Sequence, residues 1–150
     1  MKTLLVCLDF SDNTDRLLAE AKVFADGICE RIVLLHVVQP GPDFTGYETG
    51  LEYSCGKTHE TITLRCDQVK TLAKKWEAAL GDMEVTALAV QGNPTQEILQ
   101  QAETLDATHI LMGTHGHGKL FHLLMGSTAQ AVLQQSLIPV VFVPVGDPAA

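Results

Sequence analysis

Short apolar runs alternate along the chain with longer segments in which apolar residues recur at every third or fourth position. The runs are too short to form helices, and within them apolar residues do not alternate with polar ones. Continuous apolar runs of this kind are typical of strands that are buried on both faces of a sheet. The pattern therefore predicts five buried strands, at residues 3–9, 31–38, 84–90, 108–113 and 140–145.

The segments between these runs show the spacing of helices that are buried along one face. Residues 12–26 predict a helix that Gly27 ends, and residues 58–81 predict a long amphipathic helix. Asn93-Pro94 supplies a cap followed by proline at the first position of a third helix. A fourth helix is predicted over residues 127–137.

Residues 41–57 are rich in glycine and other turn-forming residues and show no hydrophobic period. This composition predicts a surface loop of unusual length. Such a loop is either a lid or contact surface, or an insertion that the fold tolerates.

The alternation of strands and helices predicts the fold class. No hairpin signal joins consecutive strands, so the connections must be right-handed crossovers through helices. We therefore predict one domain over residues 1–150, a doubly wound α/β fold with five parallel strands and helices on both faces. Pro144 cannot donate a ladder hydrogen bond, which predicts an edge position for the last strand. An apolar edge tends to pair with another chain, so a homodimer is expected.

The charge of the chain limits its partners. The sequence has 18 acidic and 10 basic residues and a net charge of -8. Its average surface repels phosphodiester backbones and anionic lipids, so we expect neither nucleic-acid binding nor membrane insertion. The first apolar run leads directly into Asp9 and is too short for a signal peptide, so a cytoplasmic protein is expected. The four cysteines are widely spaced, and Cys7 is expected to be a small buried apolar residue.

Two chemically distinctive features lie at the carboxyl ends of predicted strands. Asp9 closes the first strand, and the stretch GTHGHGKLFHLLMGS, residues 113–127, follows the fourth strand. In doubly wound sheets, ligands bind beyond the carboxyl ends of the strands, where the strand order reverses. If the order is 3-2-1-4-5, the first and fourth strands are neighbours and the two features converge.

The glycine-rich stretch misses two familiar phosphate-binding motifs. Residues 113–119 match G-x-x-x-x-G-K, but Leu120 stands where the phosphate loop has Ser or Thr. Gly116 and Gly118 begin the dinucleotide motif G-x-G-x-x-G, but Phe121 replaces its third glycine. Neither a phosphate-loop NTPase nor a dinucleotide-binding protein is therefore favoured.

The remaining spacing still suits a polyphosphate. Gly113, Gly116 and Gly126 let the backbone approach an anion because they carry no Cβ. Ser127 and Thr128 add hydroxyl groups to the unpaired N–H groups at the start of the last helix.

The spacing G-x2-G-x9-G-S/T resembles the nucleotide-binding branch of the universal stress proteins. The similarity covers nearly the whole chain, through residues 2–5, 9–11, 33–37 and 136–140. The resemblance implies a sheet of order 3-2-1-4-5, dimers that pair through the last strand, and ATP, ADP or AMP as ligand, with Mg²⁺. It further implies a regulatory stress protein in which bound nucleotide modulates conformation, oligomeric state or binding to a partner protein.

By position, the resemblance assigns residues to the two ends of the nucleotide. Asp9 matches the acidic residue near the nucleoside, and Val37 matches the residue whose backbone contacts the adenine edge. Met112 and Val38 would form the walls around the base.

The small residues match the phosphate end. Gly113 and Gly116 match glycines that line the ribose and phosphates, and Gly126, Ser127 and Thr128 match the phosphate-binding turn. Alternatively, these glycines serve turn geometry alone.

Other interpretations of the polar residues stay open. Asp9 could instead cap the neighbouring turn, and Lys119 either reaches a phosphate or extends into solvent. Histidines 115, 117 and 122 could hold a metal ion, but loop histidines are more often solvated or near phosphates, so no metal site is predicted. His36 lies in an apolar run and is expected to be a hydrogen-bonded core residue.

The alternative function is an ATPase or nucleotidyl-transferring enzyme that uses the same glycine loop, with histidines as acid or base. Hydrolysis of a phosphoanhydride needs an oriented water and a base near the γ-phosphate. Asp9 is the only carboxylate expected near the crevice, at the nucleoside end, so no catalytic residue is predicted and any hydrolysis should be slow.

Overall fold

The strands form the five-stranded parallel sheet that the sequence predicts. The computed structural model describes residues 1–10, 14–39, 48–114 and 125–144, with the backbone alone for residues 48–62. Neighbouring strands pair in parallel in the order β3-β2-β1-β4-β5, which confirms the expected order. The strands are β1 (Thr3–Leu8), β2 (Arg31–Val38), β3 (Glu84–Gln91), β4 (His109–Gly113) and β5 (Val140–Val143).

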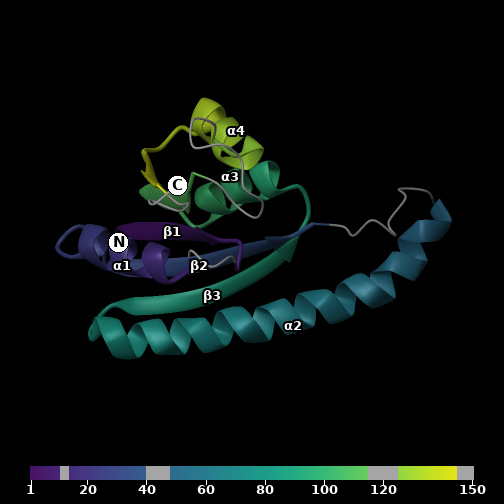
Figure 1. Ribbon diagram of the computed structural model, residues 1–150, viewed down its shortest axis with the longest axis horizontal. Helices are drawn as coiled ribbons and strands as arrows, with labels where there is room; N and C mark the ends of the chain where they lie inside the picture. Colours follow the sequence, from purple (N-terminus) through teal and green to yellow (C-terminus); the bar gives the residue numbers. More distant parts are fainter. Residues whose placement is uncertain (11–13, 40–47, 115–124, 145–150) are drawn as a thin grey trace, which may run out of the picture.

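Helices cover both faces of this sheet, as a doubly wound α/β fold requires (Figure 1). Leu4 of β1 packs into a core with α1 and α2, whereas the next residue, Leu5, packs into a second core with α3 and α4. Because successive residues of a strand point to opposite faces, each continuous apolar run supplies both cores. The helices are α1 (Thr14–Ala25), α2 (Glu48–Leu80), α3 (Pro94–Thr104) and α4 (Ser127–Gln135).

Local sequence signals set the ends of two helices. Gly27, with a φ of 74°, adopts the left-handed conformation beyond the end of α1. At the start of α3, the side chain of Asn93 accepts a hydrogen bond from the N–H of Gln96 (3.1 Å), and Pro94 occupies the first turn. Both features were predicted from the sequence.

The prediction of a long loop over residues 41–57 is wrong for its second part, because α2 already begins at Glu48. Glycine in a helix costs only about 1 kcal/mol relative to alanine, so the two glycines of this segment weaken the helix without preventing it. The first turns of α2 extend beyond the end of the sheet (Figure 1), so the sheet imposes no hydrophobic period on them. The missing period therefore reflects a helical segment that does not lie along the sheet.

The last strand lies at the edge of the sheet beside β4, as predicted. It is shorter than predicted, however, since β5 ends at Val143 and Pro144 follows the strand. Proline cannot continue the pairing because it lacks an N–H group.

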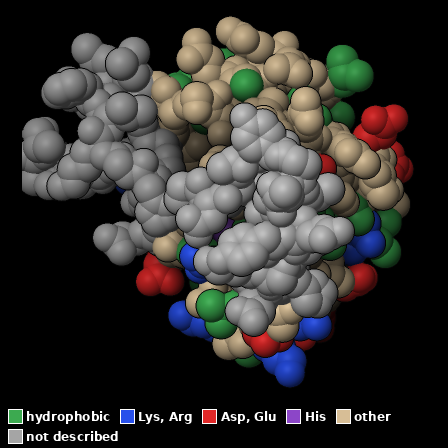
Figure 2. Space-filling model, turned by 90° about the vertical axis from the view of Figure 1, so that its right-hand side faces the viewer, with side chains coloured by type: hydrophobic (Ala, Val, Ile, Leu, Met, Phe, Trp, Pro, Cys, Tyr) green, Lys and Arg blue, Asp and Glu red, His purple; other side chains and the backbone are tan. Residues whose placement is uncertain are grey.

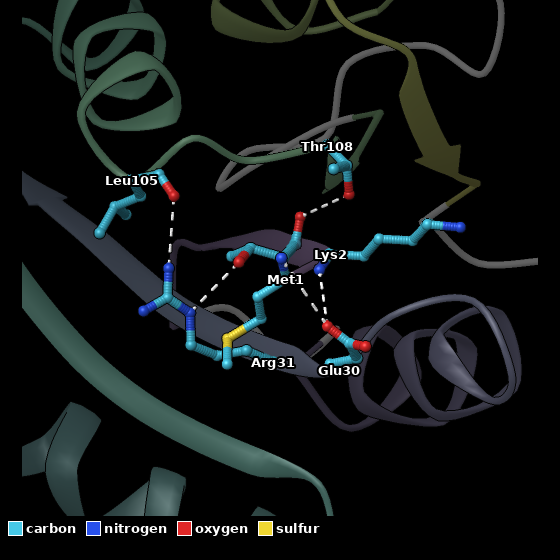
Figure 3. Close-up of polar contacts among 7 residues, drawn as sticks. Met1, Lys2, Glu30, Arg31, Leu105 and Thr108 are labelled. Carbon is cyan, nitrogen blue, oxygen red and sulfur yellow. Dashed lines mark hydrogen bonds and ion pairs between the residues drawn. The ribbon is translucent and has the colours of Figure 1, made fainter.

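Side-chain hydrogen bonds connect the amino ends of the strands (Figure 3). Arg31 donates from Nε to Thr3 Oγ1 (3.2 Å) and from Nη2 to the carbonyl of Leu105, the residue that ends α3 (3.3 Å). The hydroxyl of Thr108 donates to the carbonyl of Thr3 (3.0 Å). At the amino end of the sheet, these polar groups therefore form their hydrogen bonds within the protein.

In the described part of the chain, no helix combines the length and apolar character needed to cross a membrane.

Candidate functional site

The candidate site lies at the carboxyl end of the sheet between β1 and β4, where the strand order reverses. From β1 the chain proceeds outward through β2 and β3, and it then returns to form β4 and β5. β1 pairs with β4 up to Val6 and Leu111. Asp9, which directly follows β1, and Gly113, the last residue of β4, therefore lie at neighbouring strand ends.

Two backbone hydrogen bonds bring the start of α4 to this same point. The N–H of Thr114 donates to the carbonyl of Val143 (3.1 Å), and the N–H of Gly126 donates to the carbonyl of Thr114 (2.7 Å). The chain thus returns to the carboxyl end of β4 before α4 begins at Ser127. As a result, Gly126 lies beside Thr114, the residue that directly follows Gly113.

The start of α4 differs from that of α3 in its cap. Asn93 caps α3 with its side chain, whereas Gly126 at the start of α4 offers no side-chain hydrogen bond. The first N–H groups of a helix have no partner within the helix and lie at the positive end of its dipole. With glycine at the cap, the backbone at exposed Ser127 and half-buried Thr128 suits an external anion.

The residues expected around a base lie on β4 and β2, on either side of β1. Met112 and Val37 both pack on the sheet face that α3 and α4 cover. Met112 is 6% exposed and Val38 is 7% exposed. So little of either side chain is accessible that a base could contact only a small part of it, and the backbone of β2 would contribute most of the contact there.

Two residues near the site were not predicted from the sequence. The ring of Phe10 lies edge-on to His36, with 4.8 Å between ring centroids, and the guanidinium of Arg65 lies 5.3 Å from the Phe10 centroid. His36 itself donates from Nδ1 to the carbonyl of Leu8 (2.8 Å), which confirms the predicted hydrogen bond, although His36 is only partly buried. The only sequence signal for this cluster is an aromatic residue directly after the acid.

Several predicted site residues lie outside the described residues: Gly116, Lys119 and histidines 115, 117 and 122. Their roles stay predictions. Within the described ranges, no three His, Cys, Asp or Glu side chains gather in a group that could hold a metal ion.

Charged side chains of both signs lie along one side of this end of the molecule. Figure 2 looks onto the carboxyl ends of the strands and shows Lys and Arg interspersed with Asp and Glu along its lower part. Attraction of an anionic ligand would therefore come from local groups such as the start of α4, since the net charge of -8 opposes it.

Cys7 packs beneath the site, against the core that α3 and α4 share with the sheet. Burial raises the pKa of its thiol from 9.0 to about 12. The thiol therefore stays protonated at neutral pH and cannot act as a nucleophile. Cys7 thus packs as a small apolar residue, as predicted, but its side chain is only partly buried.

The sequence pattern of the Universal stress protein family matches residues 1–144. The chain is 33% identical over 142 residues to the Universal stress protein in QAH/OAS sulfhydrylase 3'region of Thermus aquaticus, with 95% of this chain and 98% of that protein covered. The solved structure of MJ0577, a universal stress protein of Methanocaldococcus jannaschii, superposes with a TM-score of 0.74 at 27% identity, covering 97% of each chain.

A second solved relative was determined with a ligand. The universal stress protein from Archaeoglobus fulgidus in complex with dAMP superposes with a TM-score of 0.56 at 22% identity, covering 95% of this chain and 97% of that one. At this identity, the similarity shows the shared fold.

We expect the folded protein to lose stability at alkaline pH through Cys7. Between pH 9 and 12 the unfolded thiol releases its proton while the folded thiol retains it. The stabilisation is therefore complete below pH 9 and falls by about 1.4 kcal/mol per pH unit above it. Urea denaturation of the wild type and of Cys7→Ala between pH 8 and 10.5 measures this slope, which should be shallower in the variant. Equal slopes would contradict the expectation, and Cys66→Ala on α2 is the control.

Proposed function

The chain belongs to the universal stress protein family, and we propose that it is an ATP-binding regulatory member of that family. In this proposal ATP, or ADP or AMP, binds at the carboxyl end of β1 and β4, with Mg²⁺ accompanying the phosphates. The bound nucleotide modulates the conformation of the protein, its oligomeric state or its binding to a partner protein.

The observation that carries the proposal is the placement of an acid and a helix start without a side-chain cap at neighbouring strand ends. Asp9 follows β1, and the hydrogen bond from Gly126 to Thr114 holds the start of α4 beside β4. A carboxylate accepts hydrogen bonds from ribose hydroxyls, while backbone N–H groups donate to phosphates. A nucleotide needs both kinds of group, a short distance apart.

The proposed contacts follow the two ends of the ligand. Asp9 accepts hydrogen bonds from the ribose, and the backbone of Val37 contacts the adenine edge between Met112 and Val38. The dAMP complex of the Archaeoglobus fulgidus relative supports an adenine nucleotide as the ligand class.

The phosphates are proposed to bind the small residues around α4. Gly113 and Gly116 line the ribose and phosphates, and Gly126, Ser127 and Thr128 form the phosphate-binding turn. The glycine cap of α4 supports this assignment because it adds no side chain at the helix start.

We further propose that the protein forms a homodimer through β5. This strand occupies one edge of the sheet and contains only apolar residues, VVFV. Unpaired backbone groups on an apolar edge favour pairing with a second strand.

ATP should stabilise the protein through Asp9. ATP at one hundred times its dissociation constant should raise the free energy of unfolding by about 2.7 kcal/mol. Asp9→Asn removes the negative charge that strengthens hydrogen bonds from the ribose, so the affinity should fall about tenfold. Thermal unfolding with increasing ATP and calorimetric titration measure these effects.

Asp82→Asn is the matched control for this experiment, because Asp82 is exposed in the turn before β3, at the amino end of the sheet. It should bind ATP like the wild type. Absence of any stabilisation of the wild type by saturating ATP would refute nucleotide binding. Gly116→Val tests whether the stabilisation by ATP depends on the glycine-rich stretch.

Bound ATP should stay largely intact for minutes in a single-turnover assay with Mg²⁺, because binding without rapid hydrolysis is proposed. Turnover much faster than minutes, lost on changing His115 or His117, would instead establish the alternative, an ATPase or nucleotidyl-transferring enzyme. Radiolabelled ATP and separation of the products give the rate.

The wild type should sediment as a dimer, and Val141→Lys should shift it toward the monomer because charge on an edge strand opposes pairing. Ala87→Lys on β3 is the matched control, since Ala87 and Val141 pack partly against the same core but lie on opposite edge strands. A monomeric wild type at concentrations well above micromolar would exclude the proposed dimer.

A further inference from the structure

Phe10, the residue directly after Asp9, has a backbone conformation that bulky residues rarely adopt. Its φ of 58° lies in the left-handed region, where the Cβ of any residue other than glycine is crowded. Of the described residues other than glycine, only Phe10 and Asp106 have a positive φ. Such a conformation persists only where surrounding contacts enforce it, and it often marks a functional site.

The ring of Phe10 is held from two elements. His36 of β2 meets it edge-to-face, with ring centroids 4.8 Å apart and an interplanar angle of 70°. Arg65 of α2 places its guanidinium 5.3 Å from the ring centroid, a cation–π distance. Phe10, His36 and Arg65 are called the clamp below.

The clamp is itself anchored to the strand that ends at Asp9. His36 donates from Nδ1 to the carbonyl of Leu8 (2.8 Å), and Leu8 and His36 are also paired in register between β1 and β2. Arg65 is further oriented by a hydrogen bond from Nη1 to Gln68 Oε1 (2.8 Å). Both chain neighbours of Asp9 are therefore held by contacts. Leu8 accepts the hydrogen bond from His36, and Phe10 makes the two ring contacts.

We propose that Phe10 is a positioning residue for the nucleotide site. The clamp holds Phe10 in its left-handed conformation and thereby holds the backbone of Asp9, so that the carboxylate is presented to the nucleoside end of the ligand. Through Arg65, the same contacts couple α2 to the bound nucleoside. This inference rests on the proposed nucleotide binding and adds the residues that orient its acid.

The test compares two probes that share only one end of the site. ATP engages both the acid and the start of α4, whereas inorganic tripolyphosphate has no nucleoside and engages the start of α4 alone. Phe10→Ala should weaken ATP binding about tenfold, the size of one lost charged hydrogen bond, and Arg65→Gln should weaken it several-fold. Both variants should bind tripolyphosphate like the wild type, which general damage to the fold would not allow.

Lys70→Gln is the matched control. Lys70 is exposed on the same helix as Arg65, and the substitution removes the same charge without removing a ring contact. It should bind both probes like the wild type. Phe10→Tyr keeps the ring and should retain ATP affinity. If Phe10→Ala does not fold, Arg65→Gln, whose side chain is only partly buried, carries the test alone.

A double-mutant comparison separates positioning from a direct contact. Once Asp9→Asn has removed the charged acceptor, adding Arg65→Gln should cause little further loss of ATP affinity, because both changes act on one interaction. Additive losses would overturn the inference, as would ATP affinities in the clamp variants equal to that of the wild type. If the wild type binds tripolyphosphate and ATP equally well, the inferred role of Asp9 and the clamp is wrong, but the phosphate site stands. If the wild type binds neither probe, the proposed function is wrong as well.

Discussion

The parallel pairing of β1 with β4 is the contact on which the candidate site depends. It joins parts of the chain that are distant in sequence, as the hydrogen bond from Thr108 to Thr3 shows across 105 positions. Parallel strands need crossovers, and here α1 and α2 cover one face while α3 and α4 cover the other. The connection that leaves β1 passes through α1 on one face, and the connection that reaches β4 passes through α3 on the other face. Neither connection therefore closes the space beyond the ends of these two strands.

The two edges of the sheet use their polar groups differently. At the amino edge, Arg31 connects β1, β2 and the end of α3 through its own hydrogen bonds. At the carboxyl edge, α4 begins at a glycine without a side-chain cap. Hydrogen bonds at the amino edge therefore stabilise the fold, while the carboxyl edge is the place where we propose that a ligand binds.

The clamp around Phe10 shows how the fold tolerates strain beside the site. A left-handed residue of this kind costs about 1–3 kcal/mol. An edge-to-face aromatic pair contributes about 0.5–1.5 kcal/mol and an exposed cation–π contact about 0.5–1 kcal/mol. The cost and the two contributions are of similar size. The contacts of Phe10 with His36 and Arg65 can therefore offset the strain of its left-handed conformation.

Local signals in the sequence predicted the strands and the cap of α3, because a continuous apolar run and the Asn93-Pro94 cap are features of neighbouring residues. The order of these elements along the chain then predicted the fold class. The same signals placed Asp9 and Gly113 at strand ends. They failed at Glu48, because α2 begins beyond the end of the sheet, where the sheet imposes no hydrophobic period. The closure of Gly126 on Thr114 and the contact of Phe10 with Arg65 were decided only by the tertiary structure, since they join residues that no local pattern connects.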